Sequence, residues 1–501
     1  MIDPRTPVVV GVGEVDQRID AKVALEPISL FAAAVRAADA DTGRPGALLA
    51  RADTVAAVQI VSWPYADAGA RVSEALGIEP RRTVVSTVGG NSPQLLVNEM
   101  AAAIAAGEAD IVVIGGGESM HTRWRARREP RVHLEWPVDT GTPCANVVGD
   151  PRPGTSDIEQ AHWAMAPTHI YPLLETALRA AAGRSVDEHR KAVGALWARF
   201  AAVAAANPHA WSRVAYSPDD ISRPTPDNRM VVFPYTKRMC ANIDVDQGAA
   251  LLLCSYEAAR AARISDDRLV FLHAGADAHD HWFITERAAL SAAPAIGVTT
   301  RAALAAAGTH IDDVARFDLY SCFPAAVEMA MHELGLRGAD QGDERPLTVT
   351  GGLGFAGGPV NNYPTHAIAR MVDACRADPG SFGLTTALGW YATKHSVGIW
   401  SSRPPEAFTR VDPALTQAEA DALPRRRPAG LFDGTMTVEA TSVVMERDAT
   451  PSVAIVAGLL PDGSRGLANS RDPDVLIDMT RSPWEGRVVA VANDGAANHL
   501  R

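Results

Sequence analysis

The sequence is poor in cysteine and contains no long apolar run. Five cysteines occur in 501 residues, and none stands at the paired spacing of a zinc site. They are Cys144, Cys240, Cys254, Cys322 and Cys375. We therefore expect reduced thiols in a cytoplasmic protein, and neither a disulfide framework nor a metal site. No stretch approaches the ~20 apolar residues that a membrane span needs, and the opening residues MIDPRTPVVVGVGE do not form a signal peptide.

A basic surface pattern is also missing. The formal net charge is −12, and no basic stripe with interleaved aromatic residues is present. Nucleic acid is therefore not expected as a partner. Hydrophobic residues make up 47% and charged residues 21% of the chain, which is typical of a globular protein with room for several domains.

Residues 82–120 predict one β-α-β unit between two glycine turns. Residues 83–88 are β-branched and apolar, as in a strand that is buried on both faces. Apolar residues then recur at helical spacing up to Gly107, and residues 111–114 predict the next buried strand.

The turn between the first strand and the helix consists of Gly89, Gly90, Asn91 and Ser92. Asn91 or Ser92 is expected to cap the helix, and Pro93 suits its first turn. Such a turn presents helix amides at the carboxyl end of a parallel sheet, where α/β proteins usually bind ligands.

The rest of the chain alternates between predicted strands and helices, which indicates a layered α/β fold. We expect strands at residues 7–13, 54–60, 248–255 and 271–275, and helices at 28–38, 68–76, 289–306 and 325–335. LTVTGGLGFAGGPVNNYPTHAIARMVDACR predicts a strand, a glycine-rich loop and a helix, and residues 121–245 predict an irregular insertion with helices at 167–182 and 185–206. From residue 429 on, short β segments separated by Asp-Gly and Pro turns predict a small antiparallel barrel.

The segment GEADIVVIGGGESM resembles the thiolase superfamily, acyl-CoA enzymes that make or break carbon–carbon bonds in a Claisen step. The resemblance implies an α/β fold in which two β-α-β-α-β-α-β-β halves form α/β/α/β/α layers, with a loop domain. Counted back from Gly107, the nucleophilic cysteine of thiolases falls on Gly90, which has no side chain to carry an acyl group. The chain is similar to the sterol-carrier-protein-type thiolases and to thiolase-like proteins of type 1, which lack this cysteine and carry an appended domain.

The resemblance implies five segments along the chain. They are an N-terminal thiolase half (1–120), a loop or insertion domain (121–245), a C-terminal thiolase half (246–402), a linker (403–428) and an OB-like β-barrel (429–501).

Three later loops correspond to the catalytic loops of thiolases. The first reads YSCF and matches the sterol-carrier-protein type at Cys322 and Phe323, while Tyr320 replaces the amide or imidazole that orients a water. Tyr320 and Cys322 are therefore catalytic candidates. The alternative is that both are buried packing residues, because free cysteine is often inert in protein cores.

The second loop carries Gly-His-Pro in thiolases and reads Gly357-Gly358-Pro359 here, so the histidine position is Gly358. Gly357 and Gly358 join residues 89–92 as candidates for holding a thioester oxygen. His366 lies further along the chain and is another catalytic candidate, unless it only satisfies a local hydrogen bond.

The third loop supplies a second cysteine in thiolases, but TALGWYATKHS contains no thiol. Lys394 and His395 stand out in this segment. His395 is a candidate general acid or base because its pKa lies near working pH. The alternative is a solvated Lys-His pair after a strand.

Two functions fit these residues. The first is an acyltransferase of the Claisen or retro-Claisen class with a rearranged site, in which coenzyme A or acyl-CoA is the substrate and no cofactor is bound covalently. The second is a catalytically degenerate protein that binds acyl-CoA or docks a partner through its barrel. Covalent acyl transfer through a cysteine at position 90 is excluded, and a nucleic-acid-binding barrel is disfavoured by the acidic charge.

The resemblance also bears on assembly. Thiolases usually dimerise through the sheet edge that contains the strand before Gly89. We expect a homodimer through this edge, or a monomer or a complex with a hetero-partner if the C-terminal domain shields it.

Overall fold

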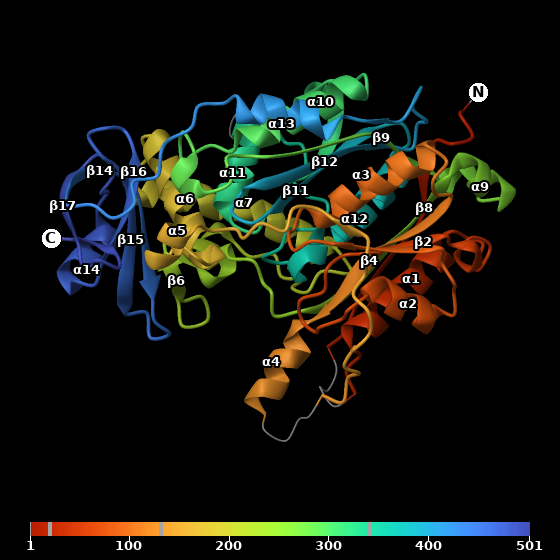
Figure 1. Cartoon of the computed structure of the whole chain (residues 1–501), viewed down its shortest axis with the longest axis horizontal. Helices are drawn as coiled ribbons and strands as arrows, with labels where there is room; N and C mark the ends of the chain where they lie inside the picture. Colours follow the sequence, from red (N-terminus) through yellow and green to blue (C-terminus); the bar gives the residue numbers. More distant parts are fainter. Residues whose placement is uncertain (1, 19–22, 130–133, 339–341) are drawn as a thin grey trace.

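Two layers of strands, with helices between and outside them, form most of the molecule (Figure 1). The computed structural model describes residues 2–18, 23–129, 134–338 and 342–501. In Figure 1 the layers follow one another from bottom to top, and the C-terminal barrel lies at the left end. None of the helices in these ranges is long and apolar enough to cross a membrane.

The first half contains five strands in the order β1-β8-β4-β2-β3. Its elements are β1 (Pro7–Asp16), α1 (Pro27–Asp41), β2 (Thr54–Ala57), α2 (Ala68–Leu76), β3 (Arg82–Ser86), α3 (Ser92–Ala105), β4 (Ile111–Ser119) and β8 (Asp246–Ser255). Helices α1 and α2 cover its outer face.

The second half contains the strands β10-β11-β12-β9, and a short pairing between β9 and β1 joins the two halves. Its elements are α9 (Tyr256–Ala261), β9 (Val270–His279), α10 (Pro294–Ala306), β10 (Val314–Asp318), α11 (Pro324–Glu333), α12 (Tyr363–Ala377), β11 (Phe382–Gly389) and β12 (Lys394–Ser401). The strand β13 (Thr409–Arg410) and the helix α13 (Pro413–Asp421) follow and pack on β9.

Helices α3 and α12 lie side by side between the two strand layers. Their apolar side chains form one core with both sheets, including Leu96 and Ile104 of α3 and Ile368 and Met371 of α12. Because α3 is covered on all sides, ten of its fourteen residues are buried. The predicted single apolar stripe therefore underestimates how much of this helix is buried.

Most of the regular elements in the insertion between the halves are helices. Its elements are α4 (Met120–Arg128), β5 (Val147–Val148), α5 (Asp157–Ala161), α6 (Pro167–Ala181), α7 (Val186–Ala206), α8 (Pro218–Ser222), β6 (Met230–Phe233) and β7 (Tyr235–Thr236). Helix α7 begins with a capping box in which Ser185 and Glu188 bond each other's backbone amides, as its sequence favours. Helix α4 projects from the body of the molecule (Figure 1).

The C-terminal region forms a closed five-stranded barrel. Its elements are β14 (Gly434–Met445), β15 (Pro451–Leu459), β16 (Arg465–Ser470), α14 (Pro473–Arg481), β17 (Val488–Asn493) and β18 (Asn498–Leu500). Around the barrel the order is β14-β15-β16-β18-β17 and back to β14; β16 and β18 pair in parallel and the other pairs are antiparallel. The predicted layered α/β fold with a small OB-like C-terminal barrel is thus confirmed.

The barrel is joined to the insertion through a shared sheet. Strand β6 pairs with β14 at Phe233 and Val232, opposite Val443 and Val444, so the barrel's sheet continues into β6 and β7.

Several element predictions are wrong in detail. Residues 248–255 do not open the second half, because they belong to β8, which lies between β1 and β4 of the first half. The second half therefore begins after β8 and not after residue 245. No strand forms at residues 347–349. The Asp318 carboxylate accepts the backbone amides of Val349 and Thr350 at 2.9 and 3.2 Å, so these amides cannot pair with another strand. Helix α10 begins at Pro294 and not at residue 289, since proline favours the first helical turn.

Candidate functional site

The glycine turn at residues 89–92 lies at the carboxyl end of β3 and the start of α3. The Gly89 amide donates to Oδ1 of Asn361 at 2.9 Å, and the Ser92 hydroxyl donates to the Thr87 carbonyl at 2.8 Å. Asn91 occupies the cap position but its side chain makes no capping hydrogen bond, and its Oδ1 is buried without a partner. The Asn91 side-chain oxygen is therefore a buried acceptor without a donor, whereas the Gly89 amide already donates a hydrogen bond.

Gly90 has no room for a side chain. A Cβ on this residue would lie 2.5 Å from the Leu388 carbonyl oxygen and 2.6 Å from Cζ of Tyr320, and the Tyr320 hydroxyl would be closer still. Real Cβ atoms do not approach other atoms this closely. Tyr320 therefore fills the space that a thiol at this turn would need.

Tyr320 and Cys322 follow β10 and are both buried. The Tyr320 amide donates to Oγ1 of Thr386 at 2.9 Å, and its ring packs edge-on against Tyr363. Burial raises the pKa of the Cys322 thiol to about 12, although the nearby Tyr171 hydroxyl opposes this shift. A thiol with that pKa stays protonated near neutral pH and is a poor nucleophile.

His366 and Gly358 are bound to parts of the structure other than the turn. Nδ1 of His366 lies 2.8 Å from Oε1 of Glu14 on β1, and its Nε2 is buried without a partner. The Gly358 amide donates to the Asn242 carbonyl at 2.9 Å, so it is not available to a thioester oxygen. A Cβ on Gly357, whose φ is +115°, would lie 2.9 Å from Cδ of Gln247, so this glycine is required by both space and backbone conformation.

His395 is buried, so the solvated alternative for this residue is wrong. Its Nε2 lies 2.9 Å from Oδ2 of Asp280. With Tyr320 and Ile296 it lines a closed cavity of about 10 Å³, which is close to the minimum that one water molecule needs. A cavity of this size cannot admit a thioester.

Lys394 reaches the glycine turn from the opposite side of the same strand. Its Nζ donates to the Val88 carbonyl at 2.6 Å and to the Asp150 carbonyl at 3.4 Å, and it lies 5.4 Å from the Trp390 ring centroid. Neighbouring residues of a strand point to opposite faces, so Lys394 faces the turn whereas His395 faces α10. Lys394 and His395 were both singled out from the sequence, but the register of β12 determines which of the two side chains reaches the turn.

An open pocket of about 510 Å³ adjoins this turn. Its lining is mainly apolar and includes Thr87, Val88, Asp150, Pro153 and Trp390. Volume, apolar lining and location at the end of parallel strands are typical of a small-molecule site.

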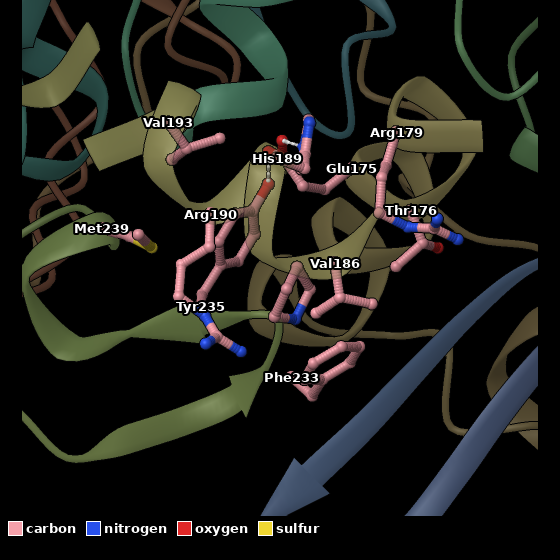
Figure 2. Close-up of a pocket in the computed structure, with 11 residues that line it drawn as sticks. Glu175, Thr176, Arg179, Val186, His189, Arg190, Val193, Phe233, Tyr235 and Met239 are labelled. Atoms are coloured by element: carbon pink, nitrogen blue, oxygen red, sulfur yellow. Dashed lines mark hydrogen bonds and ion pairs between the residues drawn. The ribbon is translucent and has the colours of Figure 1, made fainter. Parts of the chain in front are cut away.

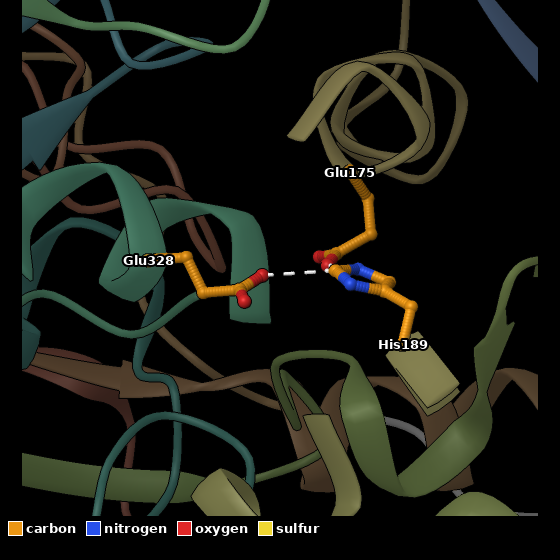
Figure 3. A group of neighbouring side chains, drawn as sticks. All are labelled: Glu175, His189 and Glu328. Atoms are coloured by element: carbon orange, nitrogen blue, oxygen red, sulfur yellow. Dashed lines mark hydrogen bonds and ion pairs between the residues drawn. The ribbon is translucent and has the colours of Figure 1, made fainter. Parts of the chain in front are cut away.

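Glu175, His189 and Glu328 form the one group in the described ranges that could offer three ligand atoms to a metal ion (Figure 3). His189 Nε2 lies 2.5 Å from Oε1 of Glu175, and the Tyr235 hydroxyl donates to the other Glu175 oxygen. Nη1 of Arg184 lies 3.5 Å from both His189 and Glu328, so a cation already faces the group. Burial raises the pKa of both carboxyl groups and lowers the pKa of His189. We assign this cluster to a hydrogen-bonded link between α6, α7 and α11.

A cavity of about 20 Å³ lies beside this cluster (Figure 2). It is lined by Glu175 and His189 together with Val186, Phe233 and Met239. Phe233 also packs into the barrel core, so the cavity marks the joint between the insertion and the barrel. It is too small for an acyl-CoA.

The family described as the thiolase-like protein type 1 additional C-terminal domain matches residues 416–496. A monomeric SCP2-thiolase-like protein type 1 from Mycobacterium smegmatis is 35% identical over 100% of both chains, with a TM-score of 0.86. No curated protein matches the chain.

Two more distant structures share the fold alone. An Ltp2–ChsH2(DUF35) aldolase is 20% identical, with a TM-score of 0.60 over 79% of this chain and 98% of the other. The dimeric peroxisomal thiolase of Saccharomyces cerevisiae is 15% identical, with a TM-score of 0.58 over 80% and 98%.

Proposed function

Because the chain belongs to the thiolase-like protein type 1 family of the thiolase superfamily, we propose that it binds an acyl-CoA-type thioester without forming an acyl-enzyme at the glycine turn. One observation carries this proposal: Tyr320 and the Leu388 carbonyl occupy the space beside Gly90. A covalent acyl transfer of the thiolase type needs a nucleophilic side chain at this point, and Gly90 has none.

The engaged donors around the turn support binding over acyl transfer. The amides of Gly89, Ser92 and Gly358, which are three of the six candidates for polarising a thioester oxygen, donate to protein acceptors. Catalysis by an oxyanion hole requires such donors to point at the reacting oxygen. Cys322, His366 and His395 are accordingly proposed as packing residues with internal partners, and the Claisen-type acyltransferase becomes the second candidate.

The open pocket beside Val88 and Trp390 is the proposed binding site for the acyl end of the ligand. Its volume is sufficient for an acyl chain, and its lining includes Thr87 and Val88, which directly precede the turn. Its apolar walls suit an acyl chain, because burying apolar surface contributes about 25 cal/mol per Å².

Calorimetric titration of the full chain with CoA, acetyl-CoA and a long-chain acyl-CoA tests the proposal. We expect binding that strengthens with acyl length, an unchanged intact mass after incubation, and no thiolysis or condensation. Trp390→Ala should weaken binding by about tenfold or more, as truncation of a buried aromatic contact does. The matched control Trp163→Ala removes an exposed tryptophan that does not line the pocket and should leave binding unchanged.

An acyl group found on any side chain of residues 89–92 would contradict the proposal, as would the absence of binding for every CoA thioester. Turnover that survives Trp390→Ala but is lost in His395→Asn would favour the acyltransferase candidate instead.

We also propose that the protein is a monomer and works in the cytoplasm. Strand β5 pairs with β3 at Val147 and Val148, and so covers part of the edge through which thiolases dimerise. The barrel, which was one alternative for shielding this edge, contacts α6 and β6. The Mycobacterium smegmatis relative is described as monomeric. Light scattering on the purified chain tests the mass; a dimer would contradict the monomer, and co-purification of a second protein would indicate a hetero-partner.

A further inference from the structure

Lys394 is an unusual residue for this chain. The sequence contains 47 lysines and arginines, but its lysines are only Lys22, Lys191, Lys237 and Lys394. Lys191 and Lys237 are exposed, whereas Lys394 is 4% exposed. Arginine stays charged under all ordinary conditions, while a buried lysine can become a neutral amine. The residue type at position 394 therefore permits chemistry that the chain's abundant arginines do not.

The amine of Lys394 lies directly behind the wall of the open pocket. Nζ contacts the carbonyls of Val88 and Asp150 and the face of Trp390, and these three residues also line the pocket. A Cβ on Gly89 would lie 2.8 Å from Nζ, so the glycine makes room for the amine at the tip of α3.

Unpartnered polar atoms surround the same position. Oδ1 of Asn91 and Nε1 of Trp390 are both buried without a hydrogen-bond partner. Asn91 is 5% exposed. Its Oδ1 lies close to the Lys394 side chain, because a Cβ placed on Gly89 or on Gly389 would lie within 3 Å of both Asn91 Oδ1 and Lys394 Cε. Buried polar groups normally have partners, so an acceptor and a donor left open here point to a polar ligand group.

The loop that carries Trp390 is held in an uncommon backbone conformation. Trp390 and Ala392 have φ values of +57° and +54°, which non-glycine residues rarely adopt and which carry backbone strain. Such residues cluster at ligand sites. A pocket, two unpartnered polar atoms and a strained loop therefore lie next to the residues that the Lys394 amine contacts.

We propose that Lys394 forms an imine with a ketone or aldehyde carbon of a ligand seated in this pocket. This deepens the proposed function, on whose pocket it rests, by naming the ligand group that the turn recognises. The neutral amine attacks the carbonyl carbon, the new C–N bond displaces the carbonyl electron pair onto oxygen, and proton transfer gives a carbinolamine. Loss of one water then yields the neutral imine, which takes up one proton from solvent to give the protonated imine. Attack on a thioester would instead give a stable amide and release a thiol. Repeated turnover at Lys394 therefore requires a ketone or an aldehyde.

The electrostatic surroundings favour the neutral amine. Burial lowers the pKa of Lys394 to about 8; Asp150 opposes this shift and Arg152 adds to it. At pH 7 about a tenth of such amines are neutral, against less than about a thousandth for an ordinary lysine. The unprotonated fraction is thus on the order of a hundred times larger than usual.

Reductive trapping on the full chain tests this assignment. The protein is incubated at pH 7 with acetaldehyde or 2-butanone and sodium cyanoborohydride, and peptides are mapped by mass spectrometry. We expect alkylation of Lys394 at least about tenfold faster than alkylation of Lys191 or Lys237, which serve as exposed controls in the same sample. The advantage should shrink towards pH 10, where ordinary lysines also lose their protons.

Lys394→Arg should abolish this fast adduct, and the matched variant Lys237→Arg should leave it unchanged. Preferential labelling of the exposed lysines at pH 7, or a fast adduct that persists in Lys394→Arg, would overturn the assignment. Because these probes contain no CoA, that result would leave thioester binding by calorimetry intact, so the two proposals fail separately.

Discussion

Gly90→Ala is expected to destabilise the fold although alanine is the better helix former. The added methyl would lie 2.5 Å from the Leu388 carbonyl oxygen and 2.6 Å from the Tyr320 ring. Overpacking of a rigid core costs about 1–3 kcal/mol, and one of these neighbours is backbone that cannot rotate away. Replacing glycine gains back about 0.4–1 kcal/mol from the unfolded chain. The net loss should therefore be about 1 kcal/mol, with an upper limit of about 2.5 kcal/mol.

A double-mutant cycle with Tyr320→Leu identifies the cause. Leucine lacks the Cζ and hydroxyl atoms that crowd Gly90, so Gly90→Ala should cost less in this background. We expect a coupling of about 1–2 kcal/mol, within the range for residues in contact. The remainder belongs to the Leu388 carbonyl, which neither substitution removes.

Urea unfolding monitored by circular dichroism and by tryptophan fluorescence measures the four proteins. Gly430→Ala is the control, because a Cβ there meets nothing within 4 Å, and its midpoint should stay within about 0.5 kcal/mol of the parent. If Gly90→Ala matches Gly430→Ala, or if the cycle shows no coupling, Tyr320 does not fill the thiol position, and a cysteine introduced at position 90 would have room for its side chain. By the same reasoning Gly90→Cys should not acquire thiolase activity while Tyr320 is present.

Three further outcomes test the assignments around the site. Burial raises the pKa of Glu118 to about 7 from an ordinary value near 4.5, so its contribution to stability is present below about pH 4.5 and is lost as the pH rises through 7. Glu118→Gln should therefore remove about 3 kcal/mol of the pH dependence of the free energy of unfolding across this window. An unchanged pH dependence in urea unfolding would refute the raised pKa. Cys322, with a pKa of about 12, should react with iodoacetamide at pH 8 at least about a hundredfold more slowly than the partly exposed Cys144; faster labelling of Cys322 by mass spectrometry would restore it as a nucleophile. Burial beside Glu175 raises the pKa of Glu328, so Glu328→Gln should become more stable relative to the parent as the pH rises above about 4.5; a stoichiometric metal lost in this variant would show that the cluster binds an ion.

Local patterns in the sequence were sufficient for the β-α-β unit around residues 89–92. The strand β3, the glycine turn and α3 follow from β-branched residues, paired glycines and apolar spacing within one short stretch. The missing side chain at Gly90 is likewise a fact of the sequence, and it alone excludes an acyl-cysteine there. The OB-like barrel was predictable for the same reason, since its strands are separated by recognisable turns.

Tertiary structure decided what surrounds that turn. Tyr320 fills the space beside Gly90 from more than two hundred residues away, and no local pattern encodes that approach. The register of β12 against β9 and β11 sends Lys394 to the turn and His395 to Asp280, and a slip of one residue would exchange them. Composition and spacing fix which elements form, but the pairing of distant strands fixes which side chains meet, and the chemistry of this site depends on the latter.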